Sequence, residues 1–350
     1  MLTMVVTNKI MKNPRHSALN ASHARLGWNS SSGESAADGR SCRSPFTFLA
    51  RVTSHSWSRP YSAATHLRAR TAGSGGVVRT TRYAPGNLPD VVSLRVGTYN
   101  ILNGLAVASG QVRDRDLHAA ITALDTDIVA LQEVDYGQLR SGRADQAAIA
   151  ADAVGARSWR FAPSLIGDPS GRWEAVDLLS SPDEPSYGIA LVSRIPLHSW
   201  QARAFPAASV PVPLKVAGRR GLTPVNDHPR TVLAAVADTP EGSFTVAAAH
   251  LSFVPGWNVR QLRAITRWLA TMPAPHVLLG DLNLPGNVPA RVTRWFQLAR
   301  TRTYPSWRPR VQWDHALASA AVTAHATTTH RLAVSDHAAL TVDIDLEPGT

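Results

Sequence analysis

Side chains that can bind metal ions or move protons stand where short apolar runs of this sequence begin or end. In sheet-based domains, strand ends and the loops that follow them are where sites are usually built. The residues in question are Asn100, Glu133, His250, Asp281, Asn283, Asp336 and His337. Asp281 and Asn283 are two residues apart, so an extended backbone points both side chains to one side. They are therefore candidates for one shared site.

Asp336 and His337 are adjacent, and an extended strand would point their side chains apart. Both can serve one site only if residues 335–337 form a turn before the last apolar run.

Taken alone, each candidate is also typical of a structural position. Asp281 beside a glycine fits a turn, Glu133 fits a solvated strand end, and either histidine fits a hydrogen-bonded core position. The inference depends on the joint pattern.

A site of carboxylates, amides and histidines suits the hydrolysis of phosphate esters. Such substrates repel hydroxide until a divalent ion neutralises their charge and polarises a phosphoryl oxygen. Few carboxylates and amide oxygens suit Mg²⁺, which keeps several of its waters, and Mn²⁺ is an expected substitute. Zinc is not expected, because the chain has one cysteine, Cys42, and no HExxH run. His250 and His337 would donate hydrogen bonds to phosphoryl oxygens as charge develops.

The elements that must position these residues are indicated by hydrophobic periodicity. Leu94, Val96 and Thr98 alternate in a strand that leads to Asn100, and a helix face is expected over residues 117–124. A second helix is expected just after Trp257, with loops near residues 168–186 and 205–228. Further strands are expected at residues 127–133, 187–193, 231–238, 243–250, 276–281, 311–318 and 339–344. Many strands with interspersed helices predict one α/β or α+β domain built around packed sheets.

Basic charge is concentrated in the first 90 residues. They contain 12 Lys and Arg against 3 Asp and Glu, whereas residues 91–350 contain 24 against 22. The charge is therefore +9 for this leader and +2 for the remainder, which weakens any argument from net charge to a DNA-binding surface. The leader is rich in Ser, Arg, Gly and Ala and lacks a sustained hydrophobic period. That composition is typical of a disordered or transit-like segment, and a start site assigned too far upstream would produce it equally.

Two further expectations follow from composition. The sequence contains no apolar run of the eighteen or more residues that a membrane helix needs, so no span is expected. A single cysteine excludes an internal disulfide and fits a reducing compartment, so a cytoplasmic location is expected. A monomer is expected as well.

Seven motifs, in this order, resemble those of the endonuclease/exonuclease/phosphatase superfamily. They are GTYNILNG at residues 97–104, LQEVD at 131–135, YGIA at 187–190, AHL at 249–251, GDLN at 280–283, WDHALAS at 313–319 and SDH at 335–337. The resemblance covers about residues 93–346. It implies an α+β fold of the DNase-I-like kind, a four-layer α/β/β/α sandwich with the site at one end. It also implies one catalytic domain over residues 91–350.

The resemblance implies two groups of site residues. Glu133 resembles the principal metal carboxylate, with Asn100 beside it and Asp336 as an additional acid near the metal.

In the second group, Asp281 and Asn283 resemble the pair that orients the attacking water and holds the phosphate. His250 matches a histidine that contacts phosphate oxygens or the leaving group. His337 matches the C-terminal catalytic histidine, and Asp314 the aspartate that orients it. An aspartate so placed would favour the protonated ring. Whether Asp281 or His337 accepts the proton of water stays open at this stage.

The substrate is predicted less narrowly than the reaction. Abasic-site endonucleases of the superfamily usually carry Trp-Asn and Gln-Glu-Thr, where this chain has Tyr99-Asn100 and Gln132-Glu133-Val134. The sequence is more similar to bacterial metal-dependent hydrolases and sphingomyelinase-like enzymes. We therefore expect a phosphodiester or phosphomonoester substrate. A DNA or RNA nuclease is the leading alternative, although nucleic acid is not favoured. A catalytically silent binding module is the other, and it predicts lost site residues.

Overall fold

The computed structural model of this chain describes residues 5–6, 92–176, 184–216, 220–240, 242–319 and 322–346. The predicted leader lies outside the described residues apart from Val5–Val6. The chain divides into two compact units, the smaller made of residues 1–49 and 213–224 and the larger of the remainder. In the smaller unit, β1 (Val5–Val6) runs parallel to β10 (Val212–Val216), whose other neighbour is β11 (Thr223–Val225).

The larger unit contains a seven-stranded sheet with a parallel pair, β2 and β5, among antiparallel neighbours. This pair is in register from Val96 opposite Ile128 to Asn100 opposite Gln132. A parallel pair needs a crossover connection, and helix α1 (Asp114–Thr122) lies in it. In spatial order the strands are β17 (Val322–His330), β18 (Ala339–Leu346), β2 (Val92–Asn100), β5 (Ile128–Tyr136), β8 (Ser186–Ser193), β6 (Ser158–Gly167) and β7 (Trp173–Ala175).

A six-stranded sheet in the same unit follows a similar plan. Its parallel pair is β13 and β14, and helix α3 (Trp257–Leu269) lies in the crossover between them. In spatial order its strands are β15 (Phe296–Gln297), β16 (Asp314–Ala318), β14 (His276–Asp281), β13 (Gly242–His250), β12 (Arg230–Thr239) and β9 (Leu197–Phe205). In both sheets, a parallel pair brings the carboxyl ends of two strands to the same end of the sheet.

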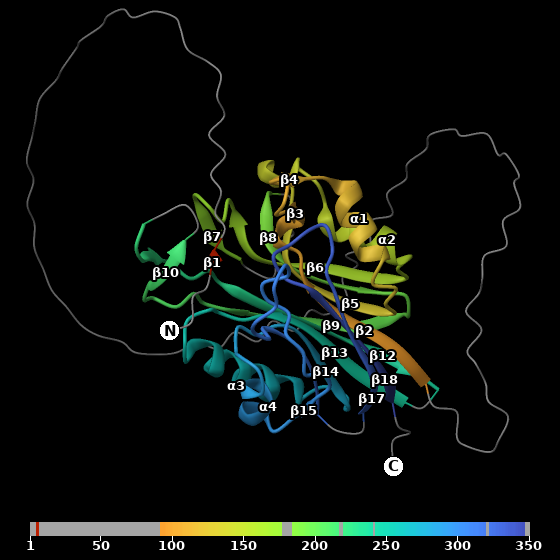
Figure 1. The fold of residues 1–350 in the computed structure, drawn as a ribbon. Coiled ribbons are helices and arrows are strands. Elements are labelled where there is room, and N and C mark those ends of the chain that lie inside the picture. The colour runs from red at the N-terminus through yellow and green to blue at the C-terminus, as the bar shows by residue number, and fades with distance from the viewer. Residues whose placement is uncertain are drawn as a thin grey trace, which may run out of the picture. The chain divides into compact units, whose positions relative to one another are not determined.

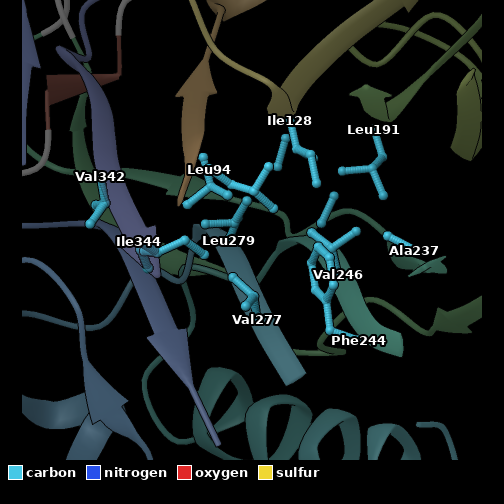
Figure 2. Packing of buried hydrophobic residues seen from close by; sticks show 14 of the residues in the cluster. Leu94, Ile128, Leu191, Ala237, Phe244, Val246, Val277, Leu279, Val342 and Ile344 are labelled. Atoms are coloured by element: carbon cyan, nitrogen blue, oxygen red, sulfur yellow. The ribbon is translucent and has the colours of Figure 1, made fainter. Parts of the chain in front are cut away.

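The two sheets pack face to face over a shared hydrophobic core (Figure 2). Leu94 and Ile128 of the seven-stranded sheet belong to the same buried cluster as Val246 and Leu279 of the six-stranded sheet. Full burial of such a side chain contributes about 1.5–3 kcal/mol. Along β13 the alternate residues belong to another cluster, Ala247 among them, on the opposite face of the sheet. Burial on both faces explains why these strands read as nearly continuous apolar runs.

Helices cover the outer face of each sheet (Figure 1). α1 and α2 (Gln146–Val154) pack on the seven-stranded sheet, with Leu117 and Ile121 of α1 fully buried. α3 and α4 (Val288–Thr293) pack on the six-stranded sheet, with Leu262 and Ile265 of α3 fully buried. The other short elements described in this unit are η1 (Leu102–Gly104), β3 (Leu105–Ala106), β4 (Gln111–Val112) and η2 (Leu139–Ser141). The predicted α+β fold with four layers and one catalytic domain is confirmed.

Several element boundaries differ from the sequence predictions. The strand predicted at residues 311–318 begins only at Asp314, because Val311 instead forms an isolated bridge with Tyr304 in the preceding loop. The helix predicted over residues 117–124 ends at Thr122, although Leu124 is buried with it. The predicted loops near residues 168–186 and 205–228 contain the short strands β7, β10 and β11. Among the described residues, no helix combines the length and apolarity needed to cross a bilayer.

Candidate active site

Strand register brings three candidate residues of the six-stranded sheet together. β13 ends at His250, which lies opposite Asp281, the last residue of the parallel strand β14. Asp281 in turn lies opposite Asp314, the first residue of the antiparallel strand β16. Neighbouring strands lie about 4.8 Å apart. Regular pairing alone therefore puts a histidine and two aspartates side by side at one end of this sheet.

Asn100 links the ends of the two sheets. Its Nδ2 donates to Oε1 of Glu133 at 3.1 Å and to Oδ2 of Asp281 at 3.2 Å. Its Oδ1 accepts from the backbone N–H of Leu102 at 3.1 Å, which fixes the orientation of the amide. Asn100 is the last residue of β2 and is almost fully buried. The predicted site residues of both sheets thus meet across this one side chain.

A β-bulge sets the direction of Glu133. In the pairing of β5 with β8, Gln132 lies opposite Ile189 and Val134 opposite Gly188, so Glu133 is the extra residue. Its φ is +58°, in the left-handed region that a glutamate rarely adopts. A bulge redirects the side chain at that position, and Glu133 is half-buried whereas Gln132 is fully buried. The sequence pattern alone gave no sign of this irregularity.

The bend before β18 brings Asp336 and His337 to the same site, as the sequence required. Ser335 has a φ of +72°, and its Oγ donates to the carbonyl of Asn100 at 2.6 Å. The same Oγ accepts from the backbone N–H of His337 at 3.0 Å. The bend is therefore tied to the end of β2. Both side chains are buried, and Oδ1 of Asp336 has no hydrogen-bond partner among the described residues.

His337 is surrounded by carboxylates. Its Nδ1 is 2.9 Å from Oδ2 of Asp314, and its Nε2 is 3.8 Å from Oδ2 of Asp281. Burial lowers the pKa of His337, but Asp314, with Asp281 and Asp336, outweighs burial and raises it to about 10. The ring of Tyr304 packs on the other side at 4.8 Å between centroids. The imidazole is therefore held in place and protonated at neutral pH.

His250 has the opposite electrostatic environment. Its Nε2 is 3.7 Å from Oδ2 of Asp281, so the carboxylate of Asp281 lies within reach of both histidines. Burial lowers the pKa of His250 well below its ordinary value, and the charges of Arg230, His337 and His228 lower it further. One site thus contains a neutral and a charged histidine, and these suit different roles.

Burial also shifts the carboxyl groups. It raises the pKa of Asp281 to about 7 despite the favourable charge of His337, and Asp314 raises it further. It raises the pKa of Asp336 to about 6, and the neighbouring charge of Glu133 adds to that effect. Crowded acids in a buried site are stabilised in their charged form by a cation. This site has an excess of negative charge that a divalent ion would neutralise.

Asn283 lies in the site, but its backbone N–H and its Nδ2 already donate hydrogen bonds. Its backbone N–H donates to Oδ1 of Asp281 at 3.0 Å, and its Nδ2 donates to the carbonyl of Leu251 at 2.9 Å. Its φ of +48° turns the chain immediately after β14. Its Oδ1 is buried without a hydrogen-bond partner among the described residues. Asn283 therefore presents an acceptor, and not a donor, to the site.

Two separate groups of side chains are candidates for holding a metal ion. Asp281, Asp314 and His337 have ligand atoms that all lie within 4.8 Å of one another. The hydrogen bond between Asp314 and His337, however, already uses one oxygen and one nitrogen of this group. Glu133 and Asp336 have oxygens that no basic side chain occupies among the described residues, and oxygen donors suit Mg²⁺ and Mn²⁺. Of the predicted group, Glu133 and Asp336 therefore fit a hard divalent cation better, whereas Asn100 turns its amide nitrogen to Glu133 and its oxygen to the backbone N–H of Leu102.

Arg230 is a site neighbour that the sequence interpretation missed. It is the first residue of β12, which pairs antiparallel with β13, so it lies beside the end of the strand that carries His250. Only 5% of its surface is exposed. Its Nη2 is 3.2 Å from Oδ1 of Asp227, and its Nε has no partner among the described residues. An arginine that opens an apolar run next to a histidine-ending strand is the signal that could have identified it.

Comparisons with known proteins agree with this geometry. The sequence profile described as Endonuclease/Exonuclease/phosphatase family matches residues 97–337. An endonuclease/exonuclease/phosphatase from Beutenbergia cavernae is 24% identical over 73% of this chain and 72% of its own, with a TM-score of 0.51. Proteins of that description from Bacteroides vulgatus and Bacteroides thetaiotaomicron are 14% and 15% identical. They cover 73% and 74% of this chain and 100% and 99% of their own, with TM-scores of 0.53 and 0.51. No curated protein matches.

Proposed function

The chain belongs to the endonuclease/exonuclease/phosphatase family, and on that premise we propose that it is a Mg²⁺-dependent phosphoesterase that activates water. One observation carries the proposal. The carboxylate of Asp281 is 3.2 Å from the amide of Asn100 and 3.7 and 3.8 Å from the rings of His250 and His337. A single buried acid thus contacts the end of β2 and two histidines in different protonation states.

Glu133 and Asp336 are the residues that would hold the metal, with Asn100 beside them donating to Glu133. When bound, a divalent ion supplies charge neutralisation and polarisation of a phosphoryl oxygen. The buried Oδ1 of Asp336 without a partner among the described residues, and the mutual repulsion of Asp336 and Glu133, support this assignment. Mn²⁺ has the same preference for oxygen ligands and should replace Mg²⁺ in solution.

The protonation states support different roles for the remaining residues. His337 keeps its proton because its pKa is about 10, so it donates a hydrogen bond to phosphoryl oxygen and does not accept a proton from water. Asp314 positions that ring through Nδ1. Asp281, with a pKa of about 7, is the better general base at neutral pH. Asn283 presents an oxygen that orients the attacking water.

His250 completes the proposed site as a neutral ring. Its low pKa leaves one nitrogen as a donor and the other as an acceptor. It can therefore donate to a phosphate oxygen without adding to the positive charge of His337. Burial of both rings strengthens these hydrogen bonds, because the surroundings are poorly polarisable.

Hydrolysis of two chromogenic esters tests the proposal. The full chain should cleave bis(p-nitrophenyl) phosphate or p-nitrophenyl phosphate with Mg²⁺ or Mn²⁺, and EDTA should abolish the reaction. Asp281→Asn should remove it, while Asp114→Asn, which alters an exposed carboxylate on α1, should retain it. Turnover that survives EDTA, or that Asp281→Asn leaves intact, would refute the proposal. A folded protein that cleaves neither ester would favour the binding-module alternative.

A further inference from the structure

Within residues 91–350, arginine is concentrated in one segment. Residues 285–313 contain six arginines and no acid, whereas the other residues of 91–350 contain 18 basic and 22 acidic side chains. The near-neutral total for residues 91–350 therefore conceals a charge of +6 on this arginine segment and −4 elsewhere. The six are Arg291, Arg294, Arg300, Arg302, Arg308 and Arg310, and all six are exposed.

The arginine segment begins and ends at the active site. It starts two residues after Asn283 and stops immediately before Asp314, and these two ends meet because β14 and β16 are adjacent. In between, β15 forms the outer edge of the six-stranded sheet, with Phe296 opposite Ala318. Ala318 is four residues from Asp314, which is about 13 Å along a strand. The segment therefore runs from β15, which lies about 13 Å from Asp314, back to the active site.

Contacts tie the second half of the segment to the catalytic bend. The backbone N–H of Ser306 donates to the carbonyl of Asp336 at 2.6 Å. The ring of Tyr304 packs on His337, and Tyr304 also bridges to Val311. These contacts close a hairpin-like loop over residues 305–310. Trp307, Arg308 and Arg310 therefore project from a loop whose base touches the site.

The exposed surface of the segment combines positive charge with aromatic rings. Arg291, Arg294 and Arg300 line one shallow hollow with Phe296. Phe296 is 62% exposed and Trp307 is 53% exposed, which is unusual for such large apolar side chains. None of the six arginines forms an ion pair with another residue in the part of the chain that the structure describes. Their charge is therefore available to an anionic partner.

We propose that the arginine segment binds the backbone of single-stranded nucleic acid and guides it into the active site. This inference rests on the proposed function, because it names the substrate class of the same site. Arginines neutralise phosphates, and exposed aromatic rings stack on bases only where those bases are unpaired. The helix α4 has six residues, and no longer helix of the segment is available to read a duplex groove. A track of about 13 Å spans a few nucleotides of a single strand.

Fluorescence anisotropy with a labelled 15-nucleotide thymidine strand in EDTA tests binding without catalysis. The variant Arg294→Gln/Arg300→Gln/Arg308→Gln should bind at least about tenfold more weakly than wild type. Its slope of log affinity against log salt should be shallower by about 2, since each lost phosphate contact removes about 0.7. Trp307→Ala should weaken binding by about tenfold through lost stacking. Melting temperatures should show that each variant is folded.

A charge-matched control is needed because residues 1–90 are also basic and the full chain is used. Arg113→Gln/Arg115→Gln/Arg157→Gln removes three exposed arginines around α1 and α2, the layer that covers the other sheet. This variant should bind like wild type. Equal weakening in the control would overturn the proposal, because binding would then follow total charge.

Three further arms separate the remaining outcomes. A duplex of the same length should bind more weakly than the single strand, and equal binding would overturn the assignment to unpaired strands. Vesicles of phosphatidylcholine with phosphatidylserine should not bind, and vesicle binding without strand binding would assign the segment to a lipid surface. If wild type cleaves the chromogenic esters but does not bind the strand, this inference fails alone. If it binds but cleaves neither ester, the proposed function fails and the binding surface remains.

Discussion

The two sheets build their halves of the site by different means. The six-stranded sheet presents His250, Asp281 and Asp314 from three adjacent strands in regular register. The seven-stranded sheet relies on irregular backbone, with Glu133 at a β-bulge and Ser335 in a bend, both at positive φ. Regular pairing keeps side chains buried and fixed relative to one another. An irregularity redirects a side chain, and at the bulge it leaves Glu133 partly open to water.

The difference matches the chemistry proposed for each half. Proton transfer needs buried groups whose pKa values are shifted, and Asp281 is 2% exposed. A Mg²⁺ ion keeps several waters, so its carboxylate must reach solvent, and Glu133 is only half-buried. We therefore expect a change at Asp281 to affect catalysis directly and a change at Glu133 to act through the metal.

The largest effect should follow from Asp281→Asn. The amide keeps the shape of the side chain but cannot accept a proton, so kcat for the chromogenic diester should fall by about 10³-fold. Higher Mg²⁺ should not restore it, because the metal group of the seven-stranded sheet is intact. Initial rates across a Mg²⁺ titration check this. Recovery at high Mg²⁺ would place Asp281 among the metal ligands and remove the distinction between the halves.

Glu133→Gln should act through metal affinity. Loss of a ligand should cost at least as much as loss of an outer-shell partner, about 10–100-fold in affinity for Mg²⁺. Much of the activity should return at high Mg²⁺, in contrast to Asp281→Asn. Calorimetric titration of the folded variant measures this, with Glu174→Gln on the exposed strand β7 as the matched control. Unchanged affinity in Glu133→Gln would remove it from the ligand set.

The periodicity of apolar residues predicted most of the fold. The strand predicted at residues 276–281 has those bounds in the structure, because it is buried on both faces and reads as a clear apolar run. β17 was not predicted, since its residues are largely exposed and its run VTAHATTTH lacks an apolar pattern. Its place at the sheet edge is determined by pairing with β18, which is a tertiary contact.

Motifs located the candidate residues but not their surroundings. The turn required at residues 335–337 was foreseeable, because two adjacent side chains cannot otherwise share a site. The bulge at Glu133 was not, since it depends on the pairing of β5 with β8. Arg230 lacks a motif, and its closeness to His250 follows from the antiparallel register of β12 and β13. The net charge of residues 91–350 did not reveal the arginine segment, because a net charge does not show where along the chain the charges lie.

Asp314→Asn should test positioning between the halves, because Asp314 begins β16 and His337 lies in the bend before β18. Without that charge, the pKa of His337 should fall from about 10, since burial lowers it and Asp314 is the leading cause of its elevation. The ring should then lose its proton at a lower pH than in wild type. Nitrogen-15 NMR of the histidine rings in metal-free protein measures this directly. An unchanged pKa would show that Asp281 and Asp336 suffice, and activity should then also be preserved.

The remaining effect is on stability and concerns the contact between the two halves. His228 lies just before β12, and its ring packs edge-on against Trp173 and Tyr187 of the seven-stranded sheet, at 5.6 and 6.4 Å between centroids. Burial, with the charge of Arg230, lowers its pKa from 6.5 to about 4. The folded state therefore binds this proton less readily than the unfolded state, and its stabilising contribution is complete above pH 6.5.

That contribution is lost as pH falls from 6.5 to about 4. The gap of about 2.5 pKa units limits the loss to about 3 kcal/mol. His228→Phe keeps a ring between Trp173 and Tyr187 but cannot be protonated, so its free energy of unfolding should fall less on acidification. Urea unfolding at pH 7 and pH 4.5 measures the difference, with the exposed His198→Gln as control. Equal acid sensitivity in wild type and His228→Phe would show that protonation of His228 does not weaken this contact.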